Sequence, residues 1–224
     1  VSRANSWPCS AWDAALRVLY VGRFLDLKGM YLGLPAFAKH VAHDPGATFT
    51  LVGQGPDEQR WRALAKKLGV DQQVRWIPWL PQDKLHDVYR EHDVFLYPSL
   101  RDSGGLVVLE ALSAGLPVIC LDLGGPGVIV NAACGRVIST RKSSRTEVIE
   151  AIAAALSELA LNPALRHDLS RAAPRRTEQF TWSQLVAWLP NEIAGSPLDA
   201  ASSFRSRPSH GSFGQNFAMR SRKP

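Results

Sequence analysis

The sequence predicts an α/β fold, a doubly wound, Rossmann-like parallel sheet. Apolar runs of the length of a buried strand recur at least six times, and amphipathic stretches of helical length separate them. Glycine or proline marks most turns between a run and the next helical stretch. This alternation is typical of parallel strands joined by crossover helices. In such a sheet, ligands bind beyond the carboxyl ends of the strands.

In the first half of the chain, three strands each precede a helix. We expect the strands over residues 16–21, 47–52 and 74–77, and the helices over about 30–43, 57–68 and 82–91. Glycine-containing turns follow the first two strands, at Gly22-Arg23 and at Gly53-Gln54-Gly55-Pro56. Trp79 lies in the loop after the third strand, where it could stack on a base or pack into the core.

The second half of the chain continues the pattern. We expect strands over residues 94–97, 118–121 and 135–139, and a helix over 106–114. A glycine-rich loop is expected over residues 124–127. Ser144 and Glu147 form a capping box, and Asn162 caps the helix that follows. A final helix is expected to start at Thr181.

Composition narrows the function classes. The chain has 224 residues, 46% of them apolar and 21% charged, as in an ordinary globular domain. No apolar run reaches the roughly 18 residues of a membrane span, and no signal peptide is recognisable. Cys9, Cys120 and Cys134 show neither zinc spacing nor a disulfide framework, which favours a cytoplasmic protein. His40 and His43 are interpreted as surface residues rather than a metal pair.

Shifts in composition suggest three segments. Residues 1–15 are unpatterned and predict a linker, and residues 16–194 are expected to form one folded domain. From Gly195 the chain turns to Ser, Arg, Pro and Gly, which predicts a disordered basic tail over 195–224. The tail carries +4 of the net charge of +6. The folded part therefore lacks the basic face that nucleic-acid binding requires, and we expect no nucleic-acid partner.

Two cations follow the first strand. Arg23 comes after Gly22, and Lys28 precedes Gly29 at the start of a helix. An arginine can grip a phosphate with two N–H groups, and a lysine adds a compact positive charge. These residues could therefore clamp a diphosphate, although two exposed cations on a loop would give the same pattern.

Two carboxylates accompany the glycine turn after the fourth strand. Asp102 precedes Gly104 and Gly105, and Glu110 lies inside the helix that these glycines open. The start of such a helix presents free N–H groups and a positive dipole end, which suit phosphate. Carboxylates beside a phosphate site suit a nucleotide or a nucleotide sugar. The alternative is that Asp102 caps the helix and Glu110 is a solvated helix residue.

Together these motifs resemble the C-terminal donor-binding domain of the retaining GT-B glycosyltransferases of group 1, often called glycosyltransferase family 4. The shared pattern is Pro98-Ser99, Asp102, seven residues, Glu110-Ala111, Gly115 and Pro117-Val118, with Gly22-Arg23 and Lys28-Gly29 upstream. The match spans roughly residues 16–193. The departures are Asp102 for a glutamate, Gly104 for a phenylalanine, Pro78 for a glycine, and Val128-Ile129-Val130 where a glutamate is usual.

The resemblance implies a role for each site residue. Arg23 and Lys28 would neutralise the donor's diphosphate and the charge that grows on the leaving group, and Asp102 completes the catalytic set. Asp102 with the backbone of residues 103–106 would hold hydroxyls of the donor sugar, and Glu110 would bind the ribose. The donor-binding set is Gly22, Gly53, Ile77, Ser103, Gly104, Gly105, Leu106 and Glu110. No Asp-x-Asp motif is present, so we expect no metal and no cofactor.

The function that the resemblance implies is the donor half of a bacterial, cytoplasmic glycosyltransferase. It would transfer a hexose from a nucleotide sugar to a sugar or lipid-linked acceptor with retention, in polysaccharide or glycoconjugate synthesis. The absent N-terminal domain would bind the acceptor and contact the membrane, so the chain alone would transfer no sugar. Two alternatives are a GT-B nucleotide-sugar epimerase and a non-catalytic nucleotide-binding or assembly module.

Overall fold

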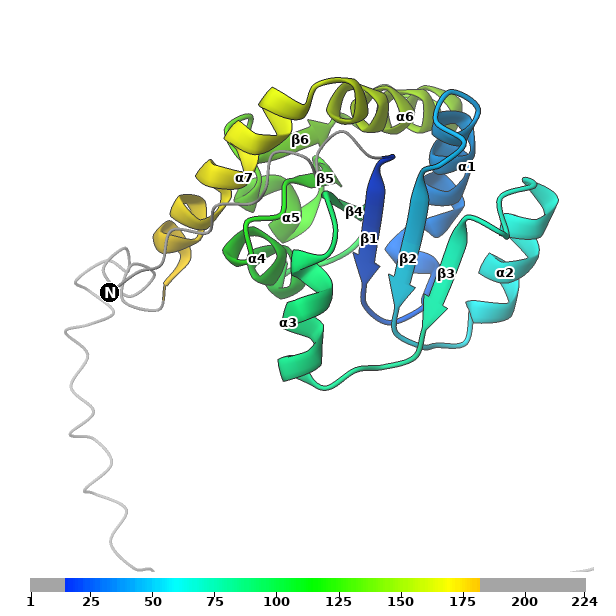
Figure 1. Cartoon of the computed structure of the whole chain (residues 1–224), viewed down its shortest axis with the longest axis horizontal. Coiled ribbons are helices and arrows are strands. Elements are labelled where there is room, and N and C mark those ends of the chain that lie inside the picture. The colour runs from blue at the N-terminus through cyan, green and yellow to red at the C-terminus, as the bar shows by residue number, and fades with distance from the viewer. Residues whose placement is uncertain (1–14, 182–224) are drawn as a thin grey trace, which may run out of the picture. The chain divides into compact units, whose positions relative to one another are not determined.

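The computed structural model describes residues 15–181. The predicted linker before Ala15, the continuation of the helix expected from Thr181 and the predicted tail lie outside the described residues. Six parallel strands form one sheet in the order β3-β2-β1-β4-β5-β6 (Figure 1). The strands are β1 (Arg17–Val21), β2 (Thr48–Val52), β3 (Val74–Ile77), β4 (Val94–Tyr97), β5 (Val118–Leu121) and β6 (Gly135–Ile138). This order confirms the predicted doubly wound sheet, with its switch point between β1 and β4.

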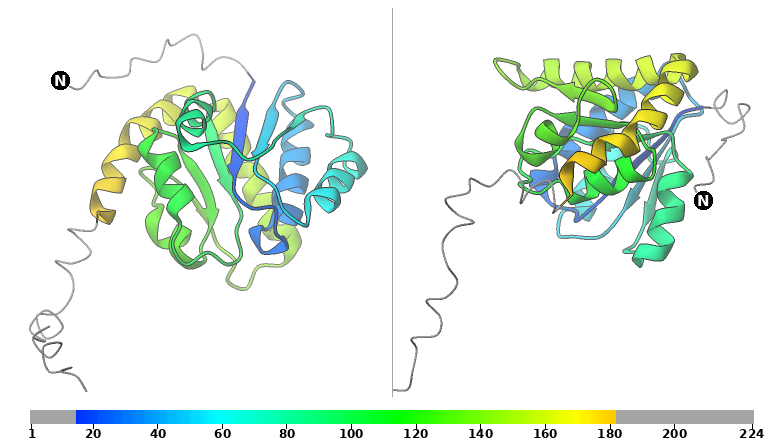
Figure 2. Two further views of the ribbon diagram at one scale, coloured as in Figure 1. Left: turned by 90° about the horizontal axis from the view of Figure 1, so that it is seen from below. Right: turned by 90° about the vertical axis from the view of Figure 1, so that its left-hand side faces the viewer.

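Helices cover both faces of the sheet. They are α1 (Met30–Val41), α2 (Glu58–Lys67), α3 (Gln82–Arg90), α4 (Leu106–Ser113), α5 (Gly124–Ile129), α6 (Arg145–Leu161) and α7 (Pro163–Thr177), with 3-10 turns η2 (Asp26–Lys28) and η3 (Glu178–Phe180). On one face α1 packs against α2 and α6, and on the other α4 packs against α5 and α7 (Figure 2). The predicted caps are confirmed: Ser144 and Glu147 form the capping box of α6, and Asn162 caps α7.

The central strands are mainly apolar and mostly buried because both faces of the sheet are covered. Leu19 of β1 aligns with Thr50 of β2 and with Phe95 of β4. An aromatic column runs along the sheet, in which Phe95, Tyr97 and Tyr20 stack with ring centroids 5.7 and 5.9 Å apart. The column ends at the carboxyl end of β4, so it fixes the position of the Tyr97 hydroxyl group.

Two sequence predictions are wrong. The segment over residues 124–127 is the first part of α5 rather than a loop. Glycine is needed at position 124 because this part of the chain lies against the segment after β4. A Cβ on Gly124 would overlap the backbone of Asp102. His40, expected at the surface, is only 1% exposed, because α6 covers this part of α1. The imidazole Nδ1 of His40 lies 3.1 Å from the hydroxyl of Ser157 on α6.

Among residues 15–181, no single helix combines the length and apolar character needed to cross a membrane, and one bent pair, α6 with the helical segment Pro163–Phe180, meets the criterion by length and composition alone.

The connections after β1 and β4 meet at Gly29. Gly29 has a left-handed φ of 70°, and a Cβ there would overlap the carbonyl oxygen of Pro98. Beside it, the backbone N–H of Leu100 donates to the carbonyl of Leu27 over 2.9 Å. Glycine therefore lets the η2 turn, which carries Lys28, lie directly against the loop that follows β4.

We expect Gly29→Ala to lower the free energy of unfolding by roughly 2–4 kcal/mol, because the new methyl group has no room against Pro98. Gly69→Ala is a matched control, since Gly69 has a φ of 72° and nothing within 4 Å of the position of a Cβ. The control should lose only about 1–2 kcal/mol, the cost of a left-handed backbone. Denaturant titration of both variants measures the difference, and equal losses would contradict the role of the approach to Pro98.

Candidate functional site

A cavity of about 850 Å³ opens at the carboxyl ends of the central strands. It is lined from the segments that follow β1, β2, β3 and β4, and therefore lies at the switch point of the sheet. Its volume falls in the range of small-molecule sites. The predicted site residues that line it are Gly22, Arg23, Lys28, Gly53, Asp102, Gly104, Gly105 and Leu106. The structure thus brings together the two cations and Asp102, which are up to 79 positions apart in the sequence.

Three predicted site residues do not line this cavity. Ser103 is exposed beside it. Ile77 lines a separate cavity of about 120 Å³, which shares Gly53 and Gln54 with the larger one. The Glu110 carboxylate accepts a hydrogen bond from the Tyr89 hydroxyl of α3 over 3.1 Å. The predicted roles of these residues stay predictions.

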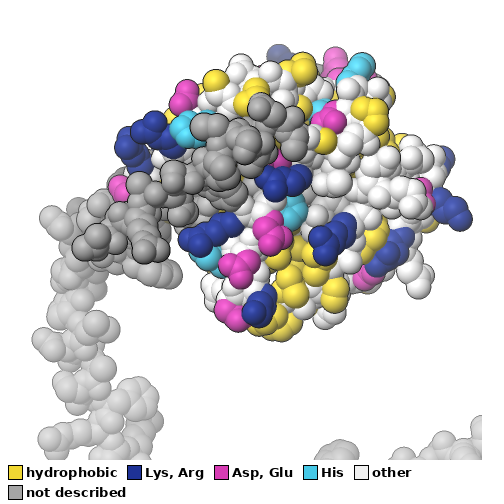
Figure 3. Space-filling model, in the orientation of Figure 1, with side chains coloured by type: hydrophobic (Ala, Val, Ile, Leu, Met, Phe, Trp, Pro, Cys, Tyr) yellow, Lys and Arg dark blue, Asp and Glu magenta, His cyan; other side chains and the backbone are white. Residues whose placement is uncertain are grey.

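The structure adds residues that the sequence motifs did not mark. Trp79 is 67% exposed and forms part of the cavity wall together with Leu80 and Leu85. It therefore does not pack into the core, which was one of the two expectations for it. Figure 3 shows hydrophobic side chains gathered over α3 and the loop before it. Tyr97 also lines the cavity, although as the last residue of a buried strand it looked like an ordinary core residue.

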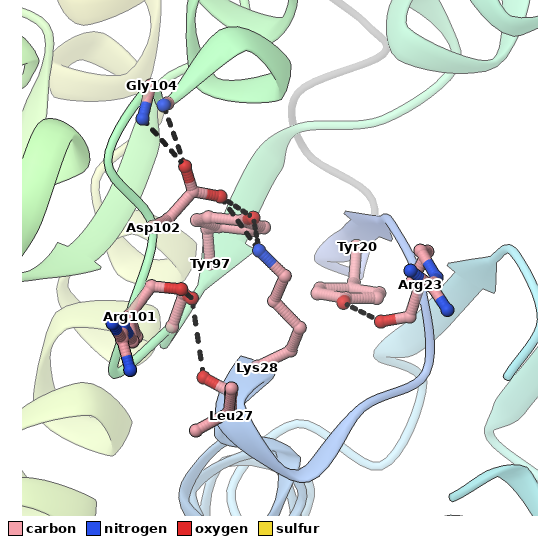
Figure 4. A network of polar contacts seen from close by, with 10 residues as sticks. Tyr20, Arg23, Leu27, Lys28, Tyr97, Arg101, Asp102 and Gly104 are labelled. Carbon is pink, nitrogen blue, oxygen red and sulfur yellow. Dashed lines mark hydrogen bonds and ion pairs between the residues drawn. The ribbon is translucent and has the colours of Figure 1, made fainter. Parts of the chain in front are cut away.

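Lys28, Asp102 and Tyr97 form a compact hydrogen-bonded group at the base of the cavity (Figure 4). The Lys28 ammonium donates to Asp102 Oδ2 and to the Tyr97 hydroxyl oxygen, in both cases over 2.7 Å. The Tyr97 hydroxyl in turn donates to Asp102 Oδ2 over 2.5 Å. The Lys28 and Asp102 side chains are only 16% and 18% exposed, so this is a largely buried ion pair.

The second oxygen of Asp102 organises the glycine turn. Asp102 Oδ1 accepts the backbone N–H groups of Gly104 and Gly105 over 3.1 and 2.8 Å. Burial alone would raise the pKa of Asp102, but the hydrogen bonds from Lys28, Tyr97 and Gly105 outweigh it and lower the pKa to about 2. The carboxylate is therefore ionised at neutral pH and carries four hydrogen bonds.

Arg23 provides a different kind of cation. Its side chain is exposed, and it makes no hydrogen bond or ion pair with any other described residue. Its carbonyl accepts the Tyr20 hydroxyl over 3.0 Å, which holds the backbone while the guanidinium stays available (Figure 4). Leu106 and Val107, the first residues of α4, also line the cavity, so the positive end of that helix borders it. These groups suit an anionic ligand.

Across residues 15–181, no three His, Cys, Asp or Glu side chains are grouped so that they could hold a metal ion.

The fold and the cavity define a Rossmann-like domain with a ligand site at its switch point. The chain belongs to the family Glycosyl transferases group 1, whose family model matches residues 13–176. Similar proteins include the D-inositol 3-phosphate glycosyltransferases of Rhodococcus erythropolis and Rhodococcus jostii, at 34% and 36% identity over 173 residues. The aligned region is 74% of this chain but only 38% and 37% of those proteins. The chain thus spans less than two fifths of the length of these relatives.

Solved structures of glycosyltransferases share the fold. The C-terminal domain of the group 1 family protein LpcC from Francisella tularensis superimposes with a TM-score of 0.66 at 21% identity, over 79% of this chain and 94% of that one. WaaG, which is involved in lipopolysaccharide biosynthesis, gives a TM-score of 0.64 at 26% identity, over 81% and 46% of the two chains. The pneumococcal O-GlcNAc transferase GtfA gives 0.69 at 19% identity, over 77% and 34%. These matches confirm a Rossmann-like domain of the GT-B glycosyltransferases.

The ion pair at Asp102 should make stability depend on acid pH. Because the folded pKa is lowered, the stabilising contribution is complete above about pH 4 and is lost as the pH falls toward about 2. We expect Asp102→Asn to be less stable than the wild type at pH 7 and to lose less stability between about pH 4 and 2. Denaturant titrations across this range measure the effect. Asp87→Asn, at an exposed position of α3, is the control and should follow the wild-type curve.

Proposed function

We propose that this chain is the donor-binding half of a retaining glycosyltransferase, which transfers a hexose from a nucleotide sugar to an acceptor. The observation that carries the proposal is the meeting of Arg23, Lys28 and Asp102 in one cavity at the switch point. Membership of a glycosyltransferase family supports it, and GtfA, which has the same fold, was solved with UDP and GlcNAc. The proposed acceptor is a sugar or lipid-linked sugar, or a phosphorylated polyol such as the one in the names of the relatives.

In the proposed reaction, the bond between the anomeric carbon and the diphosphate oxygen breaks, and its electron pair stays on that oxygen. The acceptor oxygen bonds to the anomeric carbon on the same face, and its proton passes to the departing diphosphate oxygen. Arg23 and Lys28 would stabilise the growing charge on the diphosphate, and the positive end of α4 would add to this. The acceptor side is assigned to an N-terminal half, so the chain alone should bind a nucleotide weakly and transfer no sugar.

The alternatives make different demands on the site. An epimerase of the same architecture would need a histidine for acid–base chemistry, and the described residues that line the cavity include none. A non-catalytic nucleotide-binding module would bind the same ligand without transfer. Adding the N-terminal half of a relative and assaying sugar transfer separates that module from a transferase.

Nucleotide binding tests the proposal directly. We expect one of UDP, GDP, ADP or their sugars to raise the melting temperature of the wild type and to bind in calorimetry. Arg23→Ala should weaken that binding by roughly tenfold or more, since a charge-assisted contact to phosphate is lost. Arg75→Ala removes another exposed arginine, on β3 and outside the cavity lining, and should bind as the wild type does. Glu110→Ala should abolish binding if this residue holds the ribose.

Two results would contradict the proposal. The first is that none of these nucleotides or nucleotide sugars binds to the wild type. The second is that Arg23→Ala and Arg75→Ala bind the nucleotide equally well. Robust sugar transfer by the 224-residue chain alone would contradict the assignment of the acceptor site to another domain.

Trp79 provides a test of where the base lies. An exposed indole on the cavity wall can stack on a nucleobase, which typically contributes about 1–3 kcal/mol per base. We expect Trp79→Ala to weaken nucleotide binding by about 5- to 100-fold and Trp79→Phe to retain most of it. Nucleotide should also quench the fluorescence of Trp79. Equal affinities for the wild type and the alanine variant would place the base elsewhere.

A further inference from the structure

The Tyr97 hydroxyl occupies a position that the protein core determines. Tyr97 is 1% exposed, and its ring stacks with the rings of Phe95 and Tyr20, with interplanar angles of 13° and 17°. A ring held in this way cannot change rotamer without disrupting the column. Lys28 meets both parts of this side chain: its ammonium lies 5.1 Å from the centroid of the Tyr97 ring and donates to the hydroxyl oxygen over 2.7 Å. The group that meets Lys28 is therefore rigidly placed.

The hydrogen bonds around this hydroxyl leave one donor free. A lysine ammonium has three N–H groups. Two of those of Lys28 are used, by Asp102 Oδ2 and by the Tyr97 oxygen, each over 2.7 Å. The hydroxyl proton of Tyr97 goes to Asp102, so its oxygen is free to accept from the lysine. Among residues 15–181 Lys28 donates no third hydrogen bond, so one of its N–H groups remains for a ligand in the cavity.

Asp102, by contrast, has no acceptor position left. A carboxylate offers about four lone-pair positions. Two on Oδ1 are used by the Gly104 and Gly105 N–H groups, and two on Oδ2 by Lys28 and Tyr97. A sugar hydroxyl could donate to Asp102 only by displacing one of these. The aspartate, one methylene shorter than the usual glutamate, is held back against the lysine and the turn.

From this geometry we infer that Tyr97 is a positioning residue of the donor site, and that with Asp102 it holds Lys28 so that its remaining N–H faces the donor's diphosphate. The inference rests on the proposed function and changes the role of Asp102, which supports the lysine and the glycine turn rather than the sugar hydroxyls. Because the lysine is ordered before the ligand arrives, binding does not have to order it.

The holding of Lys28 can be tested without any ligand. Competitive acetylation followed by mass spectrometry compares Lys28 with Lys66, an exposed lysine of α2. We expect the reactivity of Lys28 relative to Lys66 to be low in the wild type. It should rise at least about threefold in Tyr97→Phe and in Asp102→Asn, because one acceptor or its charge is lost. An unchanged ratio in both variants would overturn the inference. Tyr97→Phe keeps the buried ring, and a melting curve checks that it folds.

A double-mutant cycle tests whether Tyr97 affects nucleotide binding through Lys28. With the nucleoside diphosphate that stabilises the wild type, we expect Tyr97→Phe to weaken binding by about 3- to 10-fold, the usual range for one hydrogen bond. In a Lys28→Gln background the same change should have no effect, because Tyr97 acts through the lysine. Tyr20→Phe removes the other buried hydroxyl of the column without touching Lys28 or Asp102, and its effect should persist unchanged in that background.

The outcomes separate the two proposals. If Tyr97→Phe weakens binding equally with and without Lys28, Tyr97 supports packing only, and the inference fails while the nucleotide site stands. If none of UDP, GDP and ADP binds the wild type although acetylation of Lys28 rises in both variants, the proposed function fails. The conclusion that Tyr97 and Asp102 hold Lys28 in place would then stand, but the assignment of a nucleotide as the ligand would not.

Discussion

The contact between Lys28 and Asp102 is the interaction on which the candidate site depends. It joins the segment after β1 to the segment after β4. These two strands are neighbours in the sheet although 72 residues lie between Val21 and Val94. It forms because β1 and β4 pair directly, Val18 with Val94 and Leu19 with Phe95, and because Gly29 lets the two segments touch. A side chain at Gly29 would push the η2 turn away and separate the charges. The cavity is thus a consequence of strand order together with one glycine.

The same contact divides the two cations into different roles. Lys28 and Asp102 neutralise each other, and the cost of burying both charges is offset by hydrogen bonds from the Tyr97 hydroxyl and the glycine turn. Arg23 has no such partner among the described residues and provides the uncompensated positive charge of the cavity. An incoming anion therefore meets an exposed guanidinium with no partner among the described residues and an ammonium held by two hydrogen bonds. The first can adjust to the ligand, and the second constrains where the ligand sits.

The sequence was sufficient for the fold, because most strands are short, mainly apolar runs and most crossovers contain a glycine or a capping residue. It also placed Arg23, Lys28 and Asp102 at one edge, since order along the chain fixes which loops share the carboxyl side of a parallel sheet. The sequence-based prediction failed where contacts with distant parts of the chain determine the local structure. The glycines over residues 124–127 looked like a flexible loop but are helical, because they pack against the backbone of Asp102 and Ser103. His40 looked exposed because its cover, α6, lies more than 100 residues further along the chain.

The site itself was predictable in its charges but not in its hydrogen bonds. Tyr97 belongs to a strand whose four residues are all buried, and no spacing rule distinguishes its hydroxyl from any other core atom. The partner of Glu110, Tyr89, comes from α3, a helix with no motif of its own. Such contacts depend on rotamers and on packing between elements, which local sequence does not encode. Every residue that lines the cavity comes from one sheet and its crossovers. Under the proposed function, these residues would supply this domain's contacts to the donor, and the acceptor site would come from a second domain.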